Sequence, residues 1–190
     1  MLQNPDRVEI ARLWARKLEQ DAKKLQQSDR HRNLEPASAE FIHALASGIG
    51  AKRLLEIGGS SGISTIALGA AARESHGKLT SIEIEPLRQA ESRETIHRLD
   101  LQDYVDFILG DAAHIVPGLK EPFDFALIDC EKEDYIAFFE LIPVRPGTVI
   151  VADNILSHNL IEYVSHVRAR RVNSITLPIG KGLEVTVYAG

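Results

Sequence analysis

Two acidic residues and one amide residue in this 190-residue chain have the chemistry of a hard metal site. Asp129 ends the apolar run FALID, while Asp153 ends the apolar run TVIVAD and is followed by Asn154. Neighbouring parallel strands lie roughly 5 Å apart, so these ends would share one crevice if the two runs are adjacent strands. Carboxylate and amide oxygens suit Mg²⁺, whereas no His or Cys supplies a credible ligand for zinc. The alternative is that both aspartates only cap the following helices.

Lys132 follows Asp129 closely, within the charged run EKED. A hydroxyl bound to a divalent cation loses a proton more readily, and a lysine beside it could accept that proton. The alternative for Lys132 is an exposed side chain in a solvated charged run. Tyr135 is expected to pack at the start of the next helix, and His158 is expected to be a solvated loop residue.

A glycine-rich turn follows the first apolar run, in the sequence Glu56-Ile57-Gly58-Gly59-Ser60-Ser61-Gly62. Closely spaced glycines let a backbone turn sharply and approach a ligand. The N–H groups and the Ser64 hydroxyl at the start of the next helix could hold an anionic group. An NAD-linked oxidoreductase is disfavoured, because the adjacent Gly58 and Gly59 break the G-x-G-x-x-G spacing.

Two more carboxylates end the next two apolar runs. Glu83 lies 25 residues after Gly58 in SIEIEP, where a carboxylate can accept hydrogen bonds from ribose hydroxyls. Asp111, in the turn Gly110-Asp111-Ala112, could accept a hydrogen bond from the exocyclic amine of adenine. The alternatives are a solvated acid for Glu83 and the N-cap of the following helix for Asp111.

Apolar runs alternate with helical stretches along most of the chain. The runs cover 54–57, 79–84, 105–109, 125–129 and 148–153, and the helical stretches cover 64–72, 86–99 and 135–142. Strands that are apolar on both faces and separated by helices form parallel sheets covered on both sides. Residues 174–179 and 183–189, joined by GKG, predict a β-hairpin. We therefore expect an α/β fold in three layers, with a mostly parallel seven-stranded sheet whose final strand is antiparallel.

The N-terminal part, residues 1–35, is expected to be a helical extension and loop within a single domain of residues 1–190. Apolar residues recur there at helical spacing, at Val8, Ala11, Ala15, Leu18, Ala22 and Leu25. We interpret this stripe as the face that packs against the rest of the domain. The alternative is a seam with a second copy in a homodimer, since heptad-like spacing also suits a partner helix. A loop over 28–36 and a second helix over 38–47 are expected to follow.

The composition excludes several classes of protein. With 44% hydrophobic and 26% charged residues, the chain is typical of a globular protein and not of a disordered one. A net charge of −5 gives no general attraction to nucleic acid or to an anionic membrane. The single cysteine, Cys130, leaves no intrachain disulfide, which suits a reducing compartment. The chain also lacks a membrane-length apolar run and the apolar core of a signal peptide, so we expect a cytoplasmic protein.

Several sequence blocks, taken together, resemble a known family. EIGGSSG, SIEIEP, GDA, LIDCEKEDY and VIVADN occur in this order within residues 36–190. They are similar to class I S-adenosylmethionine-dependent O-methyltransferases, especially the branch of catechol and caffeoyl-coenzyme A O-methyltransferases. The resemblance implies a Rossmann-like methyltransferase fold, S-adenosylmethionine as methyl donor and a divalent cation such as Mg²⁺. The residues expected to bind the donor are Glu56, Gly58, Gly59, Ser60, Gly62, Ser64, Glu83, Ile84, Asp111, Ala112, Asp129 and Cys130.

The resemblance also distributes roles among these residues. It places Gly58 and Ser60 at the amino-acid moiety of the donor, Ser64 at its carboxylate, Glu83 at the ribose, and Asp111 and Ala112 at the adenine. Residues matching Asp129, Asp153 and Asn154 hold the metal in that family. The residue matching Lys132 acts there as a base or orients the reacting hydroxyl, so the resemblance makes Lys132 and Asp129 the candidate catalytic residues.

The acceptor is implied to be a small molecule with adjacent hydroxyls. The catechol branch holds the second hydroxyl with a glutamate, and the matching region VNSITLPIG has no acid. Trp14 is the single tryptophan, so the aromatic gate of the catechol enzymes has no tryptophan equivalent near the site. One alternative is methylation of a hydroxylated RNA base, which the acidic charge balance disfavours. The other is a donor-binding module without catalysis, which the intact metal and lysine motifs disfavour.

Overall fold

The structure, a computed structural model, describes residues 2–24 and 31–189. Its strands are β1 (Arg53–Ile57), β2 (Lys78–Glu83), β3 (Val105–Leu109), β4 (Phe125–Ile128), β5 (Val149–Ala152), β6 (Val172–Leu177) and β7 (Leu183–Tyr188). Its α-helices are α1 (Asn4–Ala22), α2 (Pro36–Gly48), α3 (Ile63–Ser75), α4 (Pro86–Arg98), α5 (Ala112–Ile115), α6 (Tyr135–Leu141) and α7 (Ile161–Arg168). The elements expected from the sequence are present, with ends shifted by a few residues. Residues 28–30 of the expected loop lie outside the described residues.

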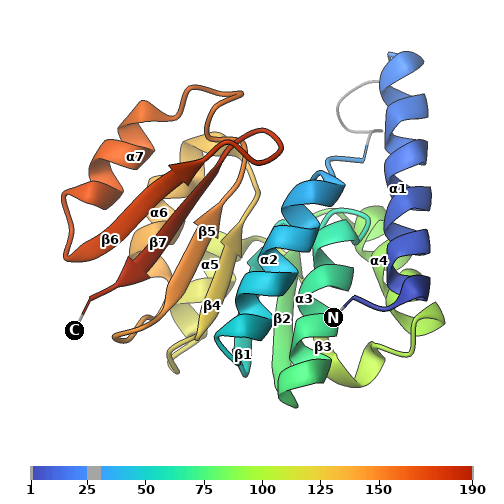
Figure 1. Cartoon of the computed structure of the whole chain (residues 1–190), viewed down its shortest axis with the longest axis horizontal. Coiled ribbons are helices and arrows are strands. Elements are labelled where there is room, and N and C mark those ends of the chain that lie inside the picture. The colour runs from blue at the N-terminus through green and yellow to red at the C-terminus, as the bar shows by residue number, and fades with distance from the viewer. Residues whose placement is uncertain (1, 25–30, 190) are drawn as a thin grey trace.

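All of these strands join one sheet, in the order β3-β2-β1-β4-β5-β7-β6 (Figure 1). The pairs from β3 to β5 are parallel, while β7 runs antiparallel to both β5 and β6. The expected α/β fold, with its antiparallel final strand, is therefore confirmed. The strand order reverses between β1 and β4, where the carboxyl ends Ile57 and Ile128 lie in register. In open parallel sheets this reversal marks the crevice that binds ligands.

The sheet is the middle of three layers. Alternate residues face opposite sides: Leu54 and Leu127 pack with α1, α2 and α3, whereas Leu55 and Ile128 pack with α5, α6 and α7 (Figure 1). This alternation explains why the central strands are apolar on both faces.

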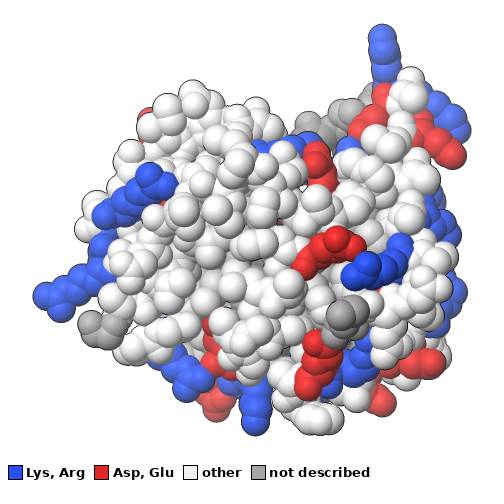
Figure 2. All heavy atoms as spheres, viewed as in Figure 1, with Lys and Arg blue, Asp and Glu red and all other residues white. Residues whose placement is uncertain are grey.

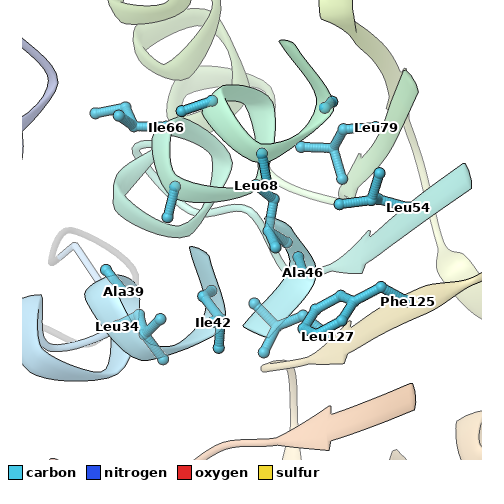
Figure 3. Packing of buried hydrophobic residues seen from close by; sticks show 14 of the residues in the cluster. Leu34, Ala39, Ile42, Ala46, Leu54, Ile66, Leu68, Leu79, Phe125 and Leu127 are labelled. Carbon is cyan, nitrogen blue, oxygen red and sulfur yellow. The ribbon is translucent and has the colours of Figure 1, made fainter. Parts of the chain in front are cut away.

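The segment just before α2 is anchored in the first of these layers. Leu34 is 1% exposed, and Ile42 of α2 points toward Leu127 and Phe125 of β4 (Figure 3). Burying a leucine side chain contributes about 2 kcal/mol. The anchor fixes residues 31–35 near the carboxyl ends of β1 and β4, which matters for the site described below.

The predicted packing face of α1 is wrong. Val8 is 60% exposed and Leu18 is 50% exposed, and the other described members of the predicted stripe are exposed as well. The buried face consists of Asp6, Ile10, Leu13 and Lys17. Asp6 pairs with Arg73 at 3.2 Å, and Lys17 pairs with Asp21 at 2.5 Å. Because half of the buried face is charged, an apolar pattern could not reveal it. Leu25 lies outside the described residues.

Candidate active site

The glycine turn after β1 lies directly against the end of β4. Gly58 has a φ of +93°, and a Cβ atom there would lie 2.1 Å from the carbonyl oxygen of Asp129. Gly62 has a φ of +112°, and a Cβ atom there would lie 2.8 Å from the Ser92 hydroxyl oxygen. A side chain at either position would therefore collide with its neighbour as well as strain the backbone. The turn thus brings the end of β1 to Asp129.

Glu83, at the end of β2, holds this turn in place. Its Oε2 accepts a hydrogen bond from the backbone N–H of Ser60 at 2.7 Å, and its Oε1 accepts one from the backbone N–H of Glu85 at 2.9 Å. The residue is 6% exposed. The alternative of a solvated acid is therefore wrong, and Glu83 is a buried link between the first two strand ends.

A cavity of about 510 Å³ opens at the carboxyl ends of β1 to β4. Of the residues expected to bind the methyl donor, those that line it are Gly58, Ser60, Glu83, Ile84, Asp111, Ala112, Asp129 and Cys130. These residues follow the ends of four different strands. The fold therefore brings together residues that are distributed over 73 positions of the sequence. Arg32, Arg88 and Phe138 also line the cavity, although the sequence analysis did not identify them.

The other expected donor-binding residues, Glu56, Gly59, Gly62 and Ser64, are not among the lining residues. Glu56 is fully buried, and its Oε2 accepts hydrogen bonds from Thr65 at 2.7 Å and from Ser81 at 2.5 Å. Burial raises the pKa of Glu56, and the Ser64 hydroxyl opposes this shift by hydrogen bonding to the carboxyl group. These residues therefore belong to the glycine-rich turn and its supporting hydrogen bonds and do not line the cavity. Their contact with a donor stays a prediction.

Asp111 and Cys130 flank the cavity in different roles. Asp111 Oδ1 accepts a hydrogen bond from the backbone N–H of Ala113 at 2.8 Å, so Asp111 is the N-cap of α5 and also lines the cavity. The two roles proposed for Asp111 are thus compatible. Burial raises the pKa of the Cys130 thiol, which stays protonated at neutral pH. Cys130 therefore lacks the thiolate that a nucleophile needs.

The three expected metal ligands converge beside this cavity. Asn154 Nδ2 lies 2.9 Å from Asp129 Oδ1 and 2.9 Å from Asp153 Oδ2. Asp153 is 3% exposed, and within the described part of the chain its Oδ1 has no hydrogen-bond partner. Burial, and after it the charge of Asp129, raises the pKa of Asp153 above its ordinary value. Neither aspartate caps a following helix, because the N-caps of the next helical turns are other residues.

These observations fit a divalent cation with oxygen ligands. Residues 2–24 and 31–189 contain no group of three His, Cys, Asp or Glu side chains that could hold a metal, so a third side-chain ligand beside the two aspartates would be the Asn154 amide. Asn154 has a φ of +64°, and this uncommon conformation holds its side chain between the two carboxylates. A half-turn of the amide would present its oxygen in place of its nitrogen. Asp129, Asp153 and Asn154 are therefore the residues that would hold the metal.

Lys132 points its ammonium group into the same cluster. Its Nζ donates to Tyr135 Oη at 2.7 Å and to the Cys130 carbonyl at 2.9 Å, and lies 3.3 Å from Asp129 Oδ1. The alternative of a solvated lysine is therefore wrong. Tyr135 is buried as expected, but its hydroxyl also donates to the backbone carbonyl of Asp153 at 3.2 Å. No motif indicated this link, because a tyrosine at a helix start is usually a packing residue.

A second cavity, of about 300 Å³, is also lined by Asp129. Its lining includes Arg32, Asp129, Lys132, Asn154, His158 and Lys181. His158 is exposed in a turn, as expected from the sequence, and it also lines this cavity. Arg32 and Asp129 line both cavities, so the two spaces meet at these residues.

Arg32 belongs to the N-terminal extension and lies where the two cavities meet. Its backbone N–H donates to the Ser60 hydroxyl at 3.1 Å, and its guanidinium pairs with Glu131. The hydrogen bond from Arg32 lowers the pKa of Glu131. Asn33 adds a hydrogen bond from its amide to the Ser61 hydroxyl at 2.8 Å. The extension is therefore part of the site, which no motif in residues 1–35 indicated.

The sheet order, the glycine turn and the acidic strand ends define a Rossmann-like methyltransferase fold, and comparisons with known proteins agree. Residues 10–185 match the family model described as O-methyltransferase, so the chain belongs to the O-methyltransferase family. Among solved structures, the O-methyltransferase of Bacillus cereus in complex with SAH has a TM-score of 0.79 at 26% identity, covering 95% of this chain and 90% of that chain.

Two curated relatives are catechol O-methyltransferases. The protein of Niastella koreensis is 37% identical over 130 residues, covering 65% of this chain and 58% of that protein. The protein of Mycobacterium tuberculosis is 35% identical over 120 residues, covering 62% of this chain and 54% of that protein. The chain thus spans a little over half the length of these relatives. None of the helices described here is long and apolar enough to cross a bilayer.

Proposed function

We propose that the protein transfers the methyl group of S-adenosylmethionine to a hydroxyl of a small acceptor that carries adjacent hydroxyls, with a divalent cation. The observation that carries this proposal is that two cavities, of about 510 and 300 Å³, meet at Asp129. A donor in the larger cavity and an acceptor in the smaller one would face each other across this residue. Methyl transfer needs such an alignment of the attacking oxygen with the methyl carbon.

The larger cavity has residues of suitable chemistry for each part of the methyl donor. Glu83 presents a buried carboxylate where ribose hydroxyls could donate to it, and Asp111 lies near the next strand end, where adenine would sit. Gly58 and Ser60 also line this cavity, where the amino-acid moiety of the donor could contact the backbone of the turn. Support from relatives comes from the Bacillus cereus structure, which contains SAH, the product left when S-adenosylmethionine loses its methyl group.

The smaller cavity suits the acceptor. A divalent cation held by Asp129, Asp153 and Asn154 would make a bound hydroxyl more acidic and stabilise the oxyanion that forms. Lys132 lies beside this cluster, and we assign it the task of accepting the hydroxyl proton or orienting the hydroxyl. The relatives named catechol O-methyltransferases support an acceptor with adjacent hydroxyls.

The experiment is a methyl-transfer screen with radiolabelled S-adenosylmethionine across catechols, hydroxycinnamoyl thioesters and hydroxylated RNA, each with and without Mg²⁺. We expect transfer to small diols that depends on Mg²⁺. Transfer to RNA alone would favour the RNA-methylating alternative. Figure 2 shows Lys and Arg scattered over the face it presents, without a basic patch on that face. Donor binding without transfer to any acceptor would indicate a non-catalytic module.

We further propose that the protein is a cytoplasmic homodimer and that residues 1–190 form a single domain. The exposed stripe of α1, with Val8 60% and Leu18 50% exposed, supports pairing with a second copy. The single cysteine suits the cytoplasm, and the joining of all strands in one sheet supports a single domain. Sedimentation of wild type and of the double variant Val8→Glu, Leu18→Glu tests the dimer. A wild-type protein that sediments as a monomer would rule it out.

A further inference from the structure

Among the described residues, one lysine that lines the smaller cavity has no ion-pair partner. Three other cations that line it are paired, Lys17 with Asp21, Arg32 with Glu131 and Lys132 with Asp129. Lys181 also lines the cavity, and its Nζ has neither a hydrogen-bond nor an ion-pair partner in the described ranges. An unpaired cation in a cavity attracts an anionic group of a ligand.

The backbone fixes Lys181 at this position. Lys181 lies in the turn between β6 and β7, and its carbonyl oxygen accepts hydrogen bonds from the N–H groups of Leu156 at 3.0 Å and Ser157 at 3.1 Å. The Gly182 carbonyl accepts another from the N–H of Ile155 at 3.0 Å. The turn is therefore bonded to the segment that directly follows Asn154, one of the candidate metal ligands.

Two glycines let this turn pack closely on both sides. A Cβ atom at Gly180, where φ is +56°, would lie 2.5 Å from the Ser38 hydroxyl oxygen. A Cβ atom at Gly182, where φ is +92°, would lie 2.5 Å from Leu156 Cγ. The backbone of Lys181, which lies between these glycines, is therefore packed against α2 and against the loop after β5. A long side chain on a rigid base loses less conformational freedom on binding than one on a mobile loop.

Lys181 lines the same cavity as Asp129 and Asn154 of the oxygen cluster. A ligand in the smaller cavity would therefore have both the oxygen cluster and the ammonium of Lys181 among its neighbours. A divalent cation at the cluster would add positive charge to the same space.

We propose that Lys181 binds a carboxylate on the acceptor, so that the preferred acceptors are small diols bearing an acid group. This inference rests on the proposed function, because it concerns the same acceptor cavity. A volume of about 300 Å³ suits one aromatic ring with a short acidic substituent. The single ammonium group is a point charge, which pairs readily with one carboxylate.

The test compares protocatechuate with its primary amide, which has the same ring and hydroxyls but no charge. Each compound is titrated calorimetrically into the protein with saturating SAH and Mg²⁺, so that binding is read without turnover. We expect the acid to bind about tenfold more tightly than the amide, as for a charge-assisted hydrogen bond. Lys181→Met should abolish this preference, and Lys181→Arg should keep most of it. The control Lys52→Met changes an exposed lysine at the opposite end of β1 and should keep the preference.

Steady-state kinetics provide the second measurement. We expect Lys181→Met to lower the ratio of kcat/KM for acid over amide about tenfold, mainly through the KM of the acid. Equal binding of acid and amide by wild type, or an unchanged ratio in Lys181→Met, would overturn the inference. Methyl transfer to both the acid and the amide, without a preference, would overturn this inference but would leave the proposed function intact. Acid-selective binding that depends on Lys181 but without transfer would instead overturn the proposed function alone.

Discussion

Asn154 Nδ2 lies 2.9 Å from Asp129 Oδ1, although 25 residues separate the two in the sequence. The contact exists because β4 and β5 are neighbours and both end at the same edge of the sheet. A backbone φ of +64° at Asn154 turns its side chain back toward Asp129. The candidate metal ligands therefore lie together beside Asp129, where the two cavities meet.

Replacing Glu83 with glutamine tests the donor cavity. The carboxylate accepts two backbone N–H groups, and the amide nitrogen of glutamine cannot accept either of them. We expect the Kd for SAH, measured by calorimetry, to rise at least about tenfold, the effect of losing one hydrogen bond to a charged group. Glu94→Gln, which changes an exposed residue of α4, is the matched control. Unchanged affinity in Glu83→Gln would remove Glu83 from the donor site.

Removing the Tyr135 hydroxyl tests how Lys132 is positioned. In Tyr135→Phe, the ammonium loses its 2.7 Å contact and the Asp153 carbonyl loses a donor. We expect kcat to fall about tenfold, equivalent to about 1.4 kcal/mol, with little change in the KM of the acceptor. The pH profile of kcat should also move, because the surroundings of Lys132 change, whereas a purely structural role would leave it in place.

Tyr163→Phe is the natural control for that variant. Tyr163 is also buried and packs edge-on against Tyr135, but in the part of the chain that the structure describes its hydroxyl has no partner. Because an unpaired buried hydroxyl costs free energy, its removal should leave the free energy of unfolding unchanged or raise it by up to about 1 kcal/mol. A loss of kcat in Tyr163→Phe equal to that in Tyr135→Phe would contradict the positioning role.

His43 predicts a pH dependence of stability. Burial lowers the pKa of His43, whose Nδ1 contacts the Ala67 carbonyl at 3.1 Å. Below roughly pH 6.5 the unfolded chain binds a proton that the folded chain resists, so the free energy of unfolding falls as the pH decreases. Urea unfolding between pH 5 and 8 should show this decline in wild type and a shallower one in His43→Gln. His97→Gln, at an exposed position, should retain the wild-type slope.

The fold and the strand-end residues could be predicted because their signals are local. Apolar runs such as FALID define buried strands, and parallel strands bring Asp129 and Asp153 to one edge whatever the details of packing. The glycine turn was recognisable for the same reason, since Gly58, Gly59 and Gly62 lie close together in the sequence.

The residues that the sequence did not reveal depend on contacts between distant segments. Arg32 reaches the site because Leu34 anchors the N-terminal extension, and neither residue belongs to a motif. The face of α1 was predicted wrongly because Asp6 and Lys17 are buried with charged partners, which an apolar pattern cannot show. Lys181 lies in a hairpin turn, where a lysine is usually solvated.

The most direct test of the account is methyl transfer from S-adenosylmethionine to catechol by metal-stripped protein, before and after addition of Mg²⁺, alongside calorimetric binding of SAH. The account predicts that transfer requires Mg²⁺, that Asp153→Ala abolishes it, and that SAH binding persists in both cases. The control Asp103→Ala, at an exposed position, should retain Mg²⁺-dependent transfer. Transfer at the same rate without metal, or by Asp153→Ala, would contradict it.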